Sequence, residues 1–133
     1  MARARKTKQL SFSMSDRVGL LSLVSSTITK AKINITAISA YGMENKAYFM
    51  MATDSNAKAK KALTPLGIGI QEEDVVVVEM PNKVGELQKV AQRIADSGIN
   101  IEYMYGTAGT SKTSVCVFKT ADDAKAIRVI NKK

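Results

Sequence analysis

The hydrophobic residues of this chain switch between two spacings, one typical of strands and one typical of helices. Alternating or continuous apolar runs predict strands, and apolar residues three or four positions apart predict helices with one buried face. The predicted strands are 10–14, 33–38, 47–53 and 75–80, and the predicted helices after the first and last of these cover 18–31 and 84–94. The order strand, helix, strand therefore begins twice along the chain.

The clearest example of this order is the stretch 80–101. A valine-rich strand, Val75 to Met80, leads into a turn at Pro81 to Lys83, and a helix opens at Val84-Gly85. The helix stops at Ser97-Gly98, because glycine can adopt the positive φ that ends a helix. A new extended run, Ile99 to Ile101, follows at once. The first turn therefore presents the unpaired N–H groups of a helix start.

This stretch repeats an earlier part of the chain. Residues 14–35 align with 80–101 without a gap, at an offset of 66, and nine of the 22 positions are identical. A hairpin and a second helix follow in both halves, and Ser15 or Asp16 is expected to cap the first helix. The repeat predicts an α+β protein with two ferredoxin-like βαββαβ units in tandem, each with an antiparallel sheet.

The predicted boundaries are a basic flexible arm at 1–9, a first unit at 10–72 and a second unit at 73–133. The second unit ends directly after its second helix, so it lacks its last strand and leaves Val75–Met80 with an open edge. An exposed valine strand is a pairing hazard. We expect Ile68–Gln71, read as a short strand before an acidic turn at 72–74, or a strand of another protomer to cover it.

Composition excludes several classes of protein. No run approaches the roughly 20 apolar residues of a membrane span, which favours a cytoplasmic protein. The single cysteine, Cys116, cannot form an internal disulfide and is expected to be a small buried hydrophobe. There is no histidine, and no nucleophile, phosphate-loop or metal-ligand motif is present. The prediction is a protein that is not an enzyme and needs no cofactor or metal.

The net charge of +8 does not by itself predict nucleic-acid binding. Four basic residues lie in 1–8, whereas 9–73 carry seven basic and five acidic side chains and 74–133 carry nine and seven. A basic arm on two nearly neutral units is more often a solvated tail than a binding arm.

Two segments carry a resemblance to a known family. Asn82-Lys83-Val84-Gly85-Glu86-Leu87, followed by Gly98-Ile99-Asn100-Ile101, resembles an ACT domain, the small-molecule regulatory module of amino-acid metabolism. The first unit, with Asp16-Arg17-Val18-Gly19-Leu20-Leu21 and then Ile33-Asn34-Ile35, resembles it less closely. Val84 and Val18 stand where the family usually has proline, and Asp16 stands where asparagine is expected.

The resemblance implies a non-catalytic, regulatory protein that binds a free amino acid at the interface between ACT units. It implies ligand contacts from the first turn and second strand of each unit, a homodimer, and an enzyme or regulator controlled in trans. The implied ligand residues are Asn82, Lys83, Val84, Gly85, Glu86, Leu87, Asn100 and Ile101 in the second unit and Asp16, Val18, Gly19, Asn34 and Ile35 in the first.

The chemistry of the second turn is consistent with this role. A helix N-terminus favours an anion by roughly 0.3–1 kcal/mol, and Gly85 lets a carboxylate approach the backbone. The amide of Asn82 can accept a hydrogen bond from an ammonium and donate one to a carboxylate, whereas the ionised Asp16 can only accept hydrogen bonds. The alternative is that Asn82 and Asp16 are helix caps and that Asn34 and Asn100 face solvent or an interface.

A second function on the same fold is RNA binding, because βαββαβ is also the architecture of the RNA-recognition motif. That module stacks bases on aromatic residues of its third strand. The third strands here, 47–50 and 113–118, lack its glycine-aromatic consensus. A protein-interaction module is the other alternative.

Overall fold

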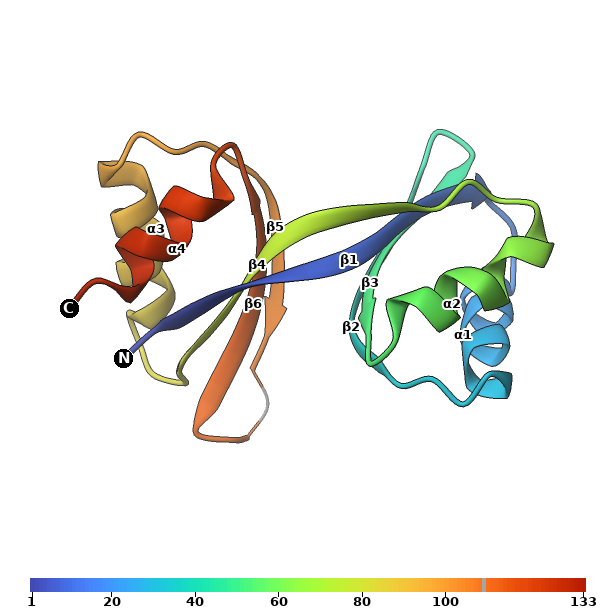
Figure 1. Cartoon of the computed structure of the whole chain (residues 1–133), viewed down its shortest axis with the longest axis horizontal. Helices are drawn as coiled ribbons and strands as arrows, with labels where there is room; N and C mark the ends of the chain where they lie inside the picture. The colour runs from blue at the N-terminus through green and yellow to red at the C-terminus, as the bar shows by residue number, and fades with distance from the viewer. Residues whose placement is uncertain (109) are drawn as a thin grey trace. The chain divides into compact units, whose positions relative to one another are not determined.

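The computed structural model describes residues 1–108 and 110–133. The chain divides into two compact units (Figure 1). The N-terminal unit is Lys8–Glu73, and the C-terminal unit combines Met1–Thr7 with Asp74–Lys133. The predicted strand-helix-strand-strand-helix order is found in both halves, without the short strand predicted at Ile68–Gln71. The boundaries differ from the predicted arm and units because the first and fourth strands are each divided between the two units.

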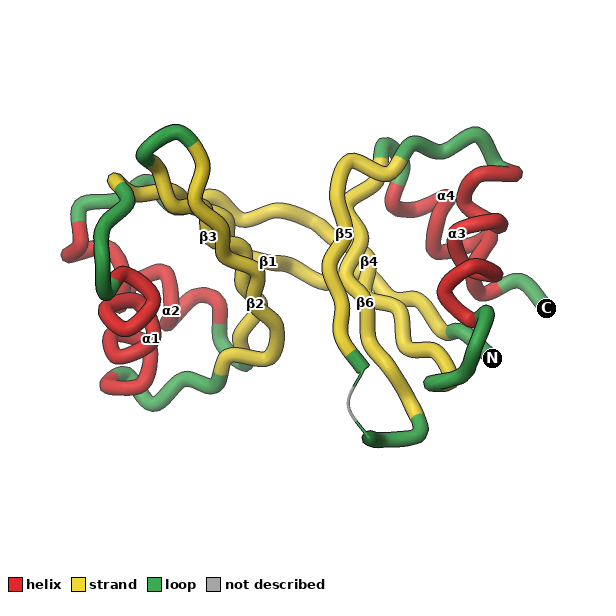
Figure 2. The backbone as a smooth tube through the Cα atoms, turned by 180° about the vertical axis from the view of Figure 1, so that it is seen from behind, coloured by secondary structure: helices red, strands yellow, loops and turns green. Residues whose placement is uncertain are grey.

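The N-terminal unit has strand order β2-β3-β1, with antiparallel pairing throughout. Two helices cover one face of its sheet (Figure 2). Its elements are β1 (Arg3–Ser15), α1 (Leu20–Lys30), β2 (Ile35–Met43), β3 (Lys46–Thr53), α2 (Asn56–Leu63), a 3-10 turn at Thr64–Leu66 and the start of β4 (Gln71–Pro81).

The C-terminal unit has strand order β1-β4-β6-β5. Its two helices lie side by side on one face of the sheet (Figures 1 and 2). Its elements are the first residues of β1, most of β4, α3 (Glu86–Asp96), β5 (Ile101–Thr107), β6 (Thr113–Thr120) and α4 (Asp123–Asn131).

The predicted flexible arm is instead the first half of β1, and it fills the place of the missing fourth strand. Ala4 is 5% exposed and packs in the core of the C-terminal unit. The Lys6 Nζ lies 3.3 Å from a carboxylate oxygen of Asp74. The open edge of Val75–Met80 is therefore covered by residues 3–7 of the same chain, rather than by Ile68–Gln71 or another protomer.

The predicted acidic turn at 72–74 is also wrong. β4 runs without a break from Gln71 to Pro81, and Ile68 to Ile70 are outside any strand. No glycine or proline separates Gln71 from Pro81, so nothing interrupts the extended backbone. The charged residues reflect exposure at the start of this strand rather than a turn.

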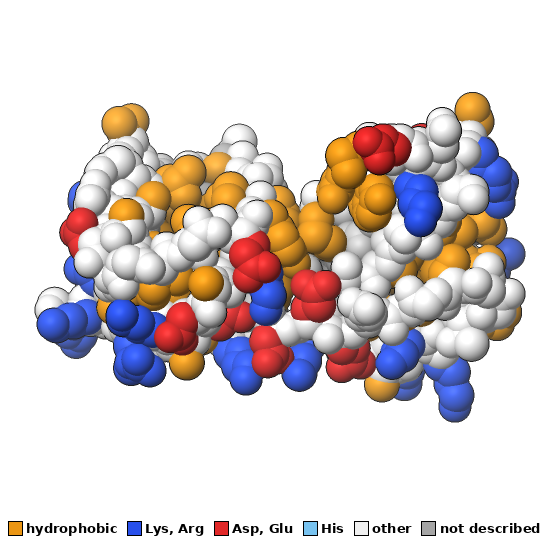
Figure 3. Space-filling model, turned by 90° about the horizontal axis from the view of Figure 1, so that it is seen from above, with side chains coloured by type: hydrophobic (Ala, Val, Ile, Leu, Met, Phe, Trp, Pro, Cys, Tyr) orange, Lys and Arg blue, Asp and Glu red, His pale blue; other side chains and the backbone are white. Residues whose placement is uncertain are grey.

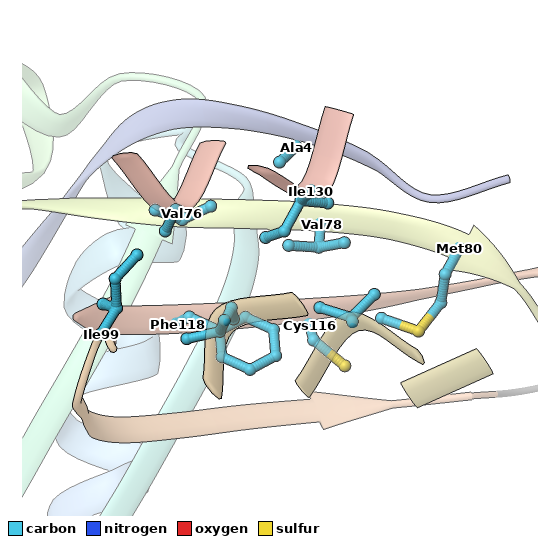
Figure 4. Packing of buried hydrophobic residues seen from close by; sticks show 11 residues of the cluster. Ala4, Val76, Val78, Met80, Ile99, Cys116, Phe118 and Ile130 are labelled. Atoms are coloured by element: carbon cyan, nitrogen blue, oxygen red, sulfur yellow. The ribbon is translucent and has the colours of Figure 1, made fainter. Parts of the chain in front are cut away.

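Each unit has its own aliphatic core between its sheet and its helices. The C-terminal core contains Val78 and Met80 of β4, Cys116 and Phe118 of β6, and Ile130 of α4 (Figure 4). The N-terminal core includes a stacked pair of phenylalanines, Phe12 and Phe49, with ring centroids 5.1 Å apart. These buried faces fix which strand residues point toward the helices.

Among the residues that the structure describes, no helix is long and apolar enough to cross a membrane.

Candidate ligand-binding site

The turn between β4 and α3 is tied to the loop between β5 and β6. The Asn82 backbone N–H donates to the Lys112 carbonyl at 2.8 Å, and the Asn82 Nδ2 donates to the Ser111 carbonyl at 3.1 Å. The amide of Asn82 therefore holds the turn against the hairpin. The sequence offered a helix cap as the alternative to ligand contact for Asn82, but no side chain caps α3.

Helix α3 begins without a side-chain cap. Gly85 occupies the N-cap with φ 89°, a backbone conformation that favours glycine. By contrast, Asp122 caps α4 by accepting a hydrogen bond from the Lys125 N–H at 3.0 Å. No side chain therefore caps the start of α3, although the Glu86 N–H donates to the Lys83 carbonyl at 3.3 Å and the Glu86 carboxylate lies in the first turn.

A pocket of about 350 Å³ lies beside this helix start on the helix-bearing face of the sheet. Its lining residues are Met80, Pro81, Asn82, Lys83, Glu86, Leu87, Met104, Gly106, Thr107, Ala108, Ser114 and Cys116. Glu86 presents a carboxylate that is 15% exposed and lies 3.3 Å from the Lys89 Nζ. The pocket lining thus combines the charged Glu86 and Lys83 with apolar side chains and with the polar Asn82, Thr107 and Ser114.

Two of the residues that line the pocket, Gly106 and Cys116, face each other across neighbouring strands and are packed tightly together. The register pairs Gly106 with Cys116. A Cβ on Gly106 would lie 2.6 Å from the Cys116 Sγ and 3.0 Å from the Val115 carbonyl oxygen, so no larger residue fits without movement. Burial raises the pKa of the Cys116 thiol, which keeps it uncharged at neutral pH.

The matching region of the N-terminal unit is filled by larger side chains. There the register pairs Ala40 with Phe49, which is 2% exposed. The position of Glu86 corresponds to Leu20, which is 4% exposed and part of the core. The two halves of the repeat therefore share a backbone but differ in what occupies this region.

The first turn of the N-terminal unit also has a different arrangement. The Asp16 N–H donates to the Asn45 carbonyl at 2.9 Å, and the Asp16 carboxylate lies against Gly42 of the hairpin. Gly19 is the N-cap of α1, with φ 92°, and neither Ser15 nor Asp16 caps that helix by a side chain. The predicted cap is therefore wrong. Val18, like Val84 in the second turn, is fully exposed.

The structure does not bring the predicted asparagines of the second strands to these turns within either unit. The Asn100 carbonyl accepts from the Ala121 N–H, and the Asn34 carbonyl accepts from the Asp54 N–H. Ala121 follows the end of β6, whereas Asn82 contacts the loop before β6 begins. The length of β6 separates Asn100 and Ile101 from the turn by roughly 20 Å at about 3.3 Å per residue, and Asn34 and Ile35 are placed likewise.

The pocket residues on β5 and β6, including Met104, Gly106 and Cys116, belong to neither of the family-like segments of the sequence. The strand register brings these residues together. It pairs Gly106 with Cys116 and depends on a bulge between Ile101 and Tyr103. That bulge shifts the pairing by one residue and reverses which side chains face the helices. The alternation of apolar residues alone could not reveal it.

The described residues were also compared with what a metal site and a nucleic-acid-binding surface require. No group of three or more metal-ligating side chains occurs within 1–108 and 110–133. Phe12, Phe49 and Phe118 are buried, and the exposed Tyr41 stacks on the half-buried Tyr48 with ring centroids 5.2 Å apart. Basic and acidic side chains are interspersed on the face seen in Figure 3, so this face carries no uniform basic surface.

The chain has clear similarity to proteins of known structure. Protein BT0572 from Bacteroides thetaiotaomicron is 29% identical with a TM-score of 0.89, covering 97% of this chain and 89% of that one. Regulatory subunits of aspartate kinase from Thermus flavus and Thermus thermophilus, the latter in a ligand-free form, are each 20% identical, with TM-scores of 0.66 and 0.68. These matches cover 98% and 94% of this chain and 95% and 91% of theirs, and at this identity they show the fold alone. A search of curated proteins finds no match.

A family model described as an ACT domain pair matches residues 5–133. This range takes in both helical turns, β1 from Arg5 onward, strands β2 to β6 and the pocket of the C-terminal unit. The resemblance seen in the sequence is thereby confirmed, and the chain belongs to the ACT domain pair family.

Proposed function

We propose that this protein is a non-catalytic regulator that binds a free amino acid in the pocket of its C-terminal unit. The observation that carries the proposal is the pocket of about 350 Å³ at the uncapped start of α3. Its size is at the small end of the range for ligand pockets, which suits a single amino acid.

The charges around the pocket match those of a zwitterion. The ligand carboxylate would lie near the N–H groups at the start of α3 and the Lys83 ammonium, both of which favour an anion. The ligand ammonium would lie near the Glu86 carboxylate and would share it with the Lys89 ammonium; the Glu86 side chain is 15% exposed, so it is shielded from solvent more than a surface group. In this arrangement Val84 and Gly85 shape the turn rather than line the pocket.

The N-terminal unit is the weaker candidate for the same ligand. Leu20 replaces the carboxylate of Glu86, and Phe49 replaces Cys116 in the corresponding core. Asp16 would also repel a carboxylate near its turn. We therefore assign ligand binding to the second turn and a packing role to the first. The pocket is lined by the C-terminal unit alone, so binding between units is not required for this assignment.

A regulatory role requires something to regulate. Two structures that share the fold are described as regulatory subunits of aspartate kinase. By analogy we propose that ligand binding here controls an enzyme or a regulator in trans, that the protein works in the cytoplasm, and that it forms a homodimer. The family membership favours this function over RNA binding.

A thermal-shift screen of the full chain with the twenty free amino acids tests the proposal. A ligand at about 100 times its dissociation constant should stabilise the fold by roughly 2.7 kcal/mol. Lys83→Ala should weaken binding, whereas the matched change Arg17→Ala, at the corresponding position of the first turn, should not. If no amino acid raises the melting temperature while an oligonucleotide does in low salt, the RNA alternative replaces this proposal.

A further inference from the structure

We propose that Met80, Met104 and Cys116 form a side-chain subsite that selects free amino acids with an uncharged aliphatic or thioether side chain. This inference rests on the proposed function, because it concerns the ligand of the same pocket. It identifies three specificity-determining residues, and none of them lies in the helical turn.

The inner end of the pocket is apolar. Met80 is 2% exposed and Cys116 is 7% exposed, and both belong to the core of the C-terminal unit. Figure 4 shows Met80 at the end of this cluster away from Ile99, with Cys116 between Met80 and Phe118. A ligand side chain that enters here continues the hydrophobic core.

The charged groups are all at the turn. Lys83 follows β4, and Glu86 opens α3, so both belong to the segment that carries the helix N-terminus. A ligand that places its ammonium and carboxylate against these groups directs its side chain toward the strands. There it meets Met104 of β5 and Cys116 of β6.

This geometry discriminates by charge and polarity. The three subsite residues offer no ionised partner, so a charged group that is placed against them loses hydration without compensation. Cys116 contributes a neutral thiol rather than an anion. Apolar side chains, in contrast, are favoured in proportion to the area that they remove from water.

The three residues also share a soft, polarizable sulfur atom. Methionine is flexible and fills irregular gaps, and sulfur atoms adapt to neighbours of varied shape. Such a wall accommodates an aliphatic or thioether chain without strict shape selection. The expected preference is therefore for a class, with methionine and leucine as its members of suitable length.

The edge of the subsite provides a matched pair of variants. Met104 is 38% exposed and lines the pocket, and its counterpart Ile38 in the N-terminal unit is 40% exposed. Met104→Gln and Ile38→Gln each place an amide at a partly exposed strand position, so their effects on folding should be similar. Only Met104→Gln places that amide against the ligand side chain.

The test measures binding of methionine, leucine, threonine, lysine and aspartate to the full chain by calorimetry, with thermal shift as a second readout. Methionine or leucine should bind, and Met104→Gln should weaken that binding about tenfold while Ile38→Gln leaves it unchanged. Saturating ligand should also slow alkylation of Cys116 by iodoacetamide, followed by mass spectrometry.

Each other result has a definite meaning. If only lysine, aspartate or threonine binds, with loss in Lys83→Ala, the subsite proposal is wrong and the regulatory proposal stands. Apolar ligands that bind equally well to Met104→Gln, or that leave Cys116 alkylation unchanged, also overturn the subsite. If none of the twenty amino acids binds, the proposed function falls, and the subsite falls with it.

Discussion

Ala4 and Asn131 exchange two hydrogen bonds across nearly the whole length of the chain. The Ala4 N–H donates to the Asn131 Oδ1 at 2.7 Å, and the Asn131 Nδ2 donates to the Ala4 carbonyl at 2.9 Å. The end of α4 thereby holds the first residues of β1 beside β4. Arg93 of α3 in turn donates to the carbonyls of Val129 and Ile130 at the end of α4.

Replacing Asn131 by alanine should loosen this strand. Two hydrogen bonds at a partly exposed site contribute about 1–2 kcal/mol, so Asn131→Ala should lower the free energy of unfolding by that amount. Denaturant titration measures the loss, and hydrogen exchange of the β4 amides should accelerate at the same time. Asn131→Asp keeps the acceptor for the Ala4 N–H but sets a carboxylate oxygen against the Ala4 carbonyl at the C-terminal end of α4, so it should destabilise the protein at least as much as Asn131→Ala. Unchanged exchange in β4 would mean that Asn131 does not secure the strand.

The sequence could predict the repeat because both copies bury the same helix face. Val24 and Ile28 in α1 correspond to Val90 and Ile94 in α3, and all four are buried. Helical spacing carries that information locally. It cannot show that residues 3–7 belong to the C-terminal unit, since pairing with β4 depends on residues about 70 positions away. The charges of Arg3, Arg5 and Lys6 led to the prediction of a flexible arm, whereas these residues belong to a strand with one buried face.

In the candidate site, too, the local features could be predicted from the sequence and the long-range ones could not. The motif located the turn at Gly85, because positive φ and an uncapped helix start are local properties. The pocket beyond it depends on Gly106 facing Cys116, which is a matter of register. The motif also grouped Asn100 with Asn82, although within the unit they lie near opposite ends of β6. Neighbours in a sequence motif need not be neighbours in a pocket.

The ends of α1 and α3 provide a test of backbone strain. Lys32 follows α1 with φ 60°, and Gly98 follows α3 with φ 69°. In both cases the next residue donates a hydrogen bond back to the helix. The Ile33 N–H donates to the Ile28 carbonyl, and the Ile99 N–H donates to the Ile94 carbonyl. The two positions are therefore equivalent, but only one of them carries the residue that prefers this conformation.

Lys32→Gly should accordingly stabilise the protein. A left-handed backbone costs an L-residue roughly 1–2 kcal/mol, and the greater freedom of glycine in the unfolded chain offsets part of this, so the expected gain is about 0.5–1 kcal/mol. Gly98→Lys should have the opposite sign. Urea unfolding of both variants measures the effect. A destabilised Lys32→Gly would show that the lysine side chain contributes more than its backbone costs.

Gly106→Ala should destabilise the C-terminal unit through its contact with Cys116. The added Cβ would overlap the Sγ, and relief requires shifts that typically cost about 1–3 kcal/mol. Cys116→Ala removes the Sγ, so the double variant should lose less stability than the sum of the two single changes. Thermal unfolding of all four proteins gives the coupling energy. Strict additivity would show that the Val115 carbonyl, rather than the thiol, determines the need for glycine.

Tyr105 gives the protein a measurable sensitivity to alkali. Burial raises the pKa of its phenol to about 12, because the low-dielectric surroundings disfavour the phenolate. In the unfolded chain the phenol ionises near its usual value of about 10. Between these values the folded state keeps a proton that the unfolded state has lost, so stability falls as the pH rises from about 10 toward 12 and is unaffected by this group at lower pH.

Tyr105→Phe removes the titration and should make the alkaline decline in stability shallower, as measured by urea unfolding at intervals from pH 8 to 12. Parallel profiles for the two proteins would show that the phenol is as solvated in the folded state as in the unfolded one.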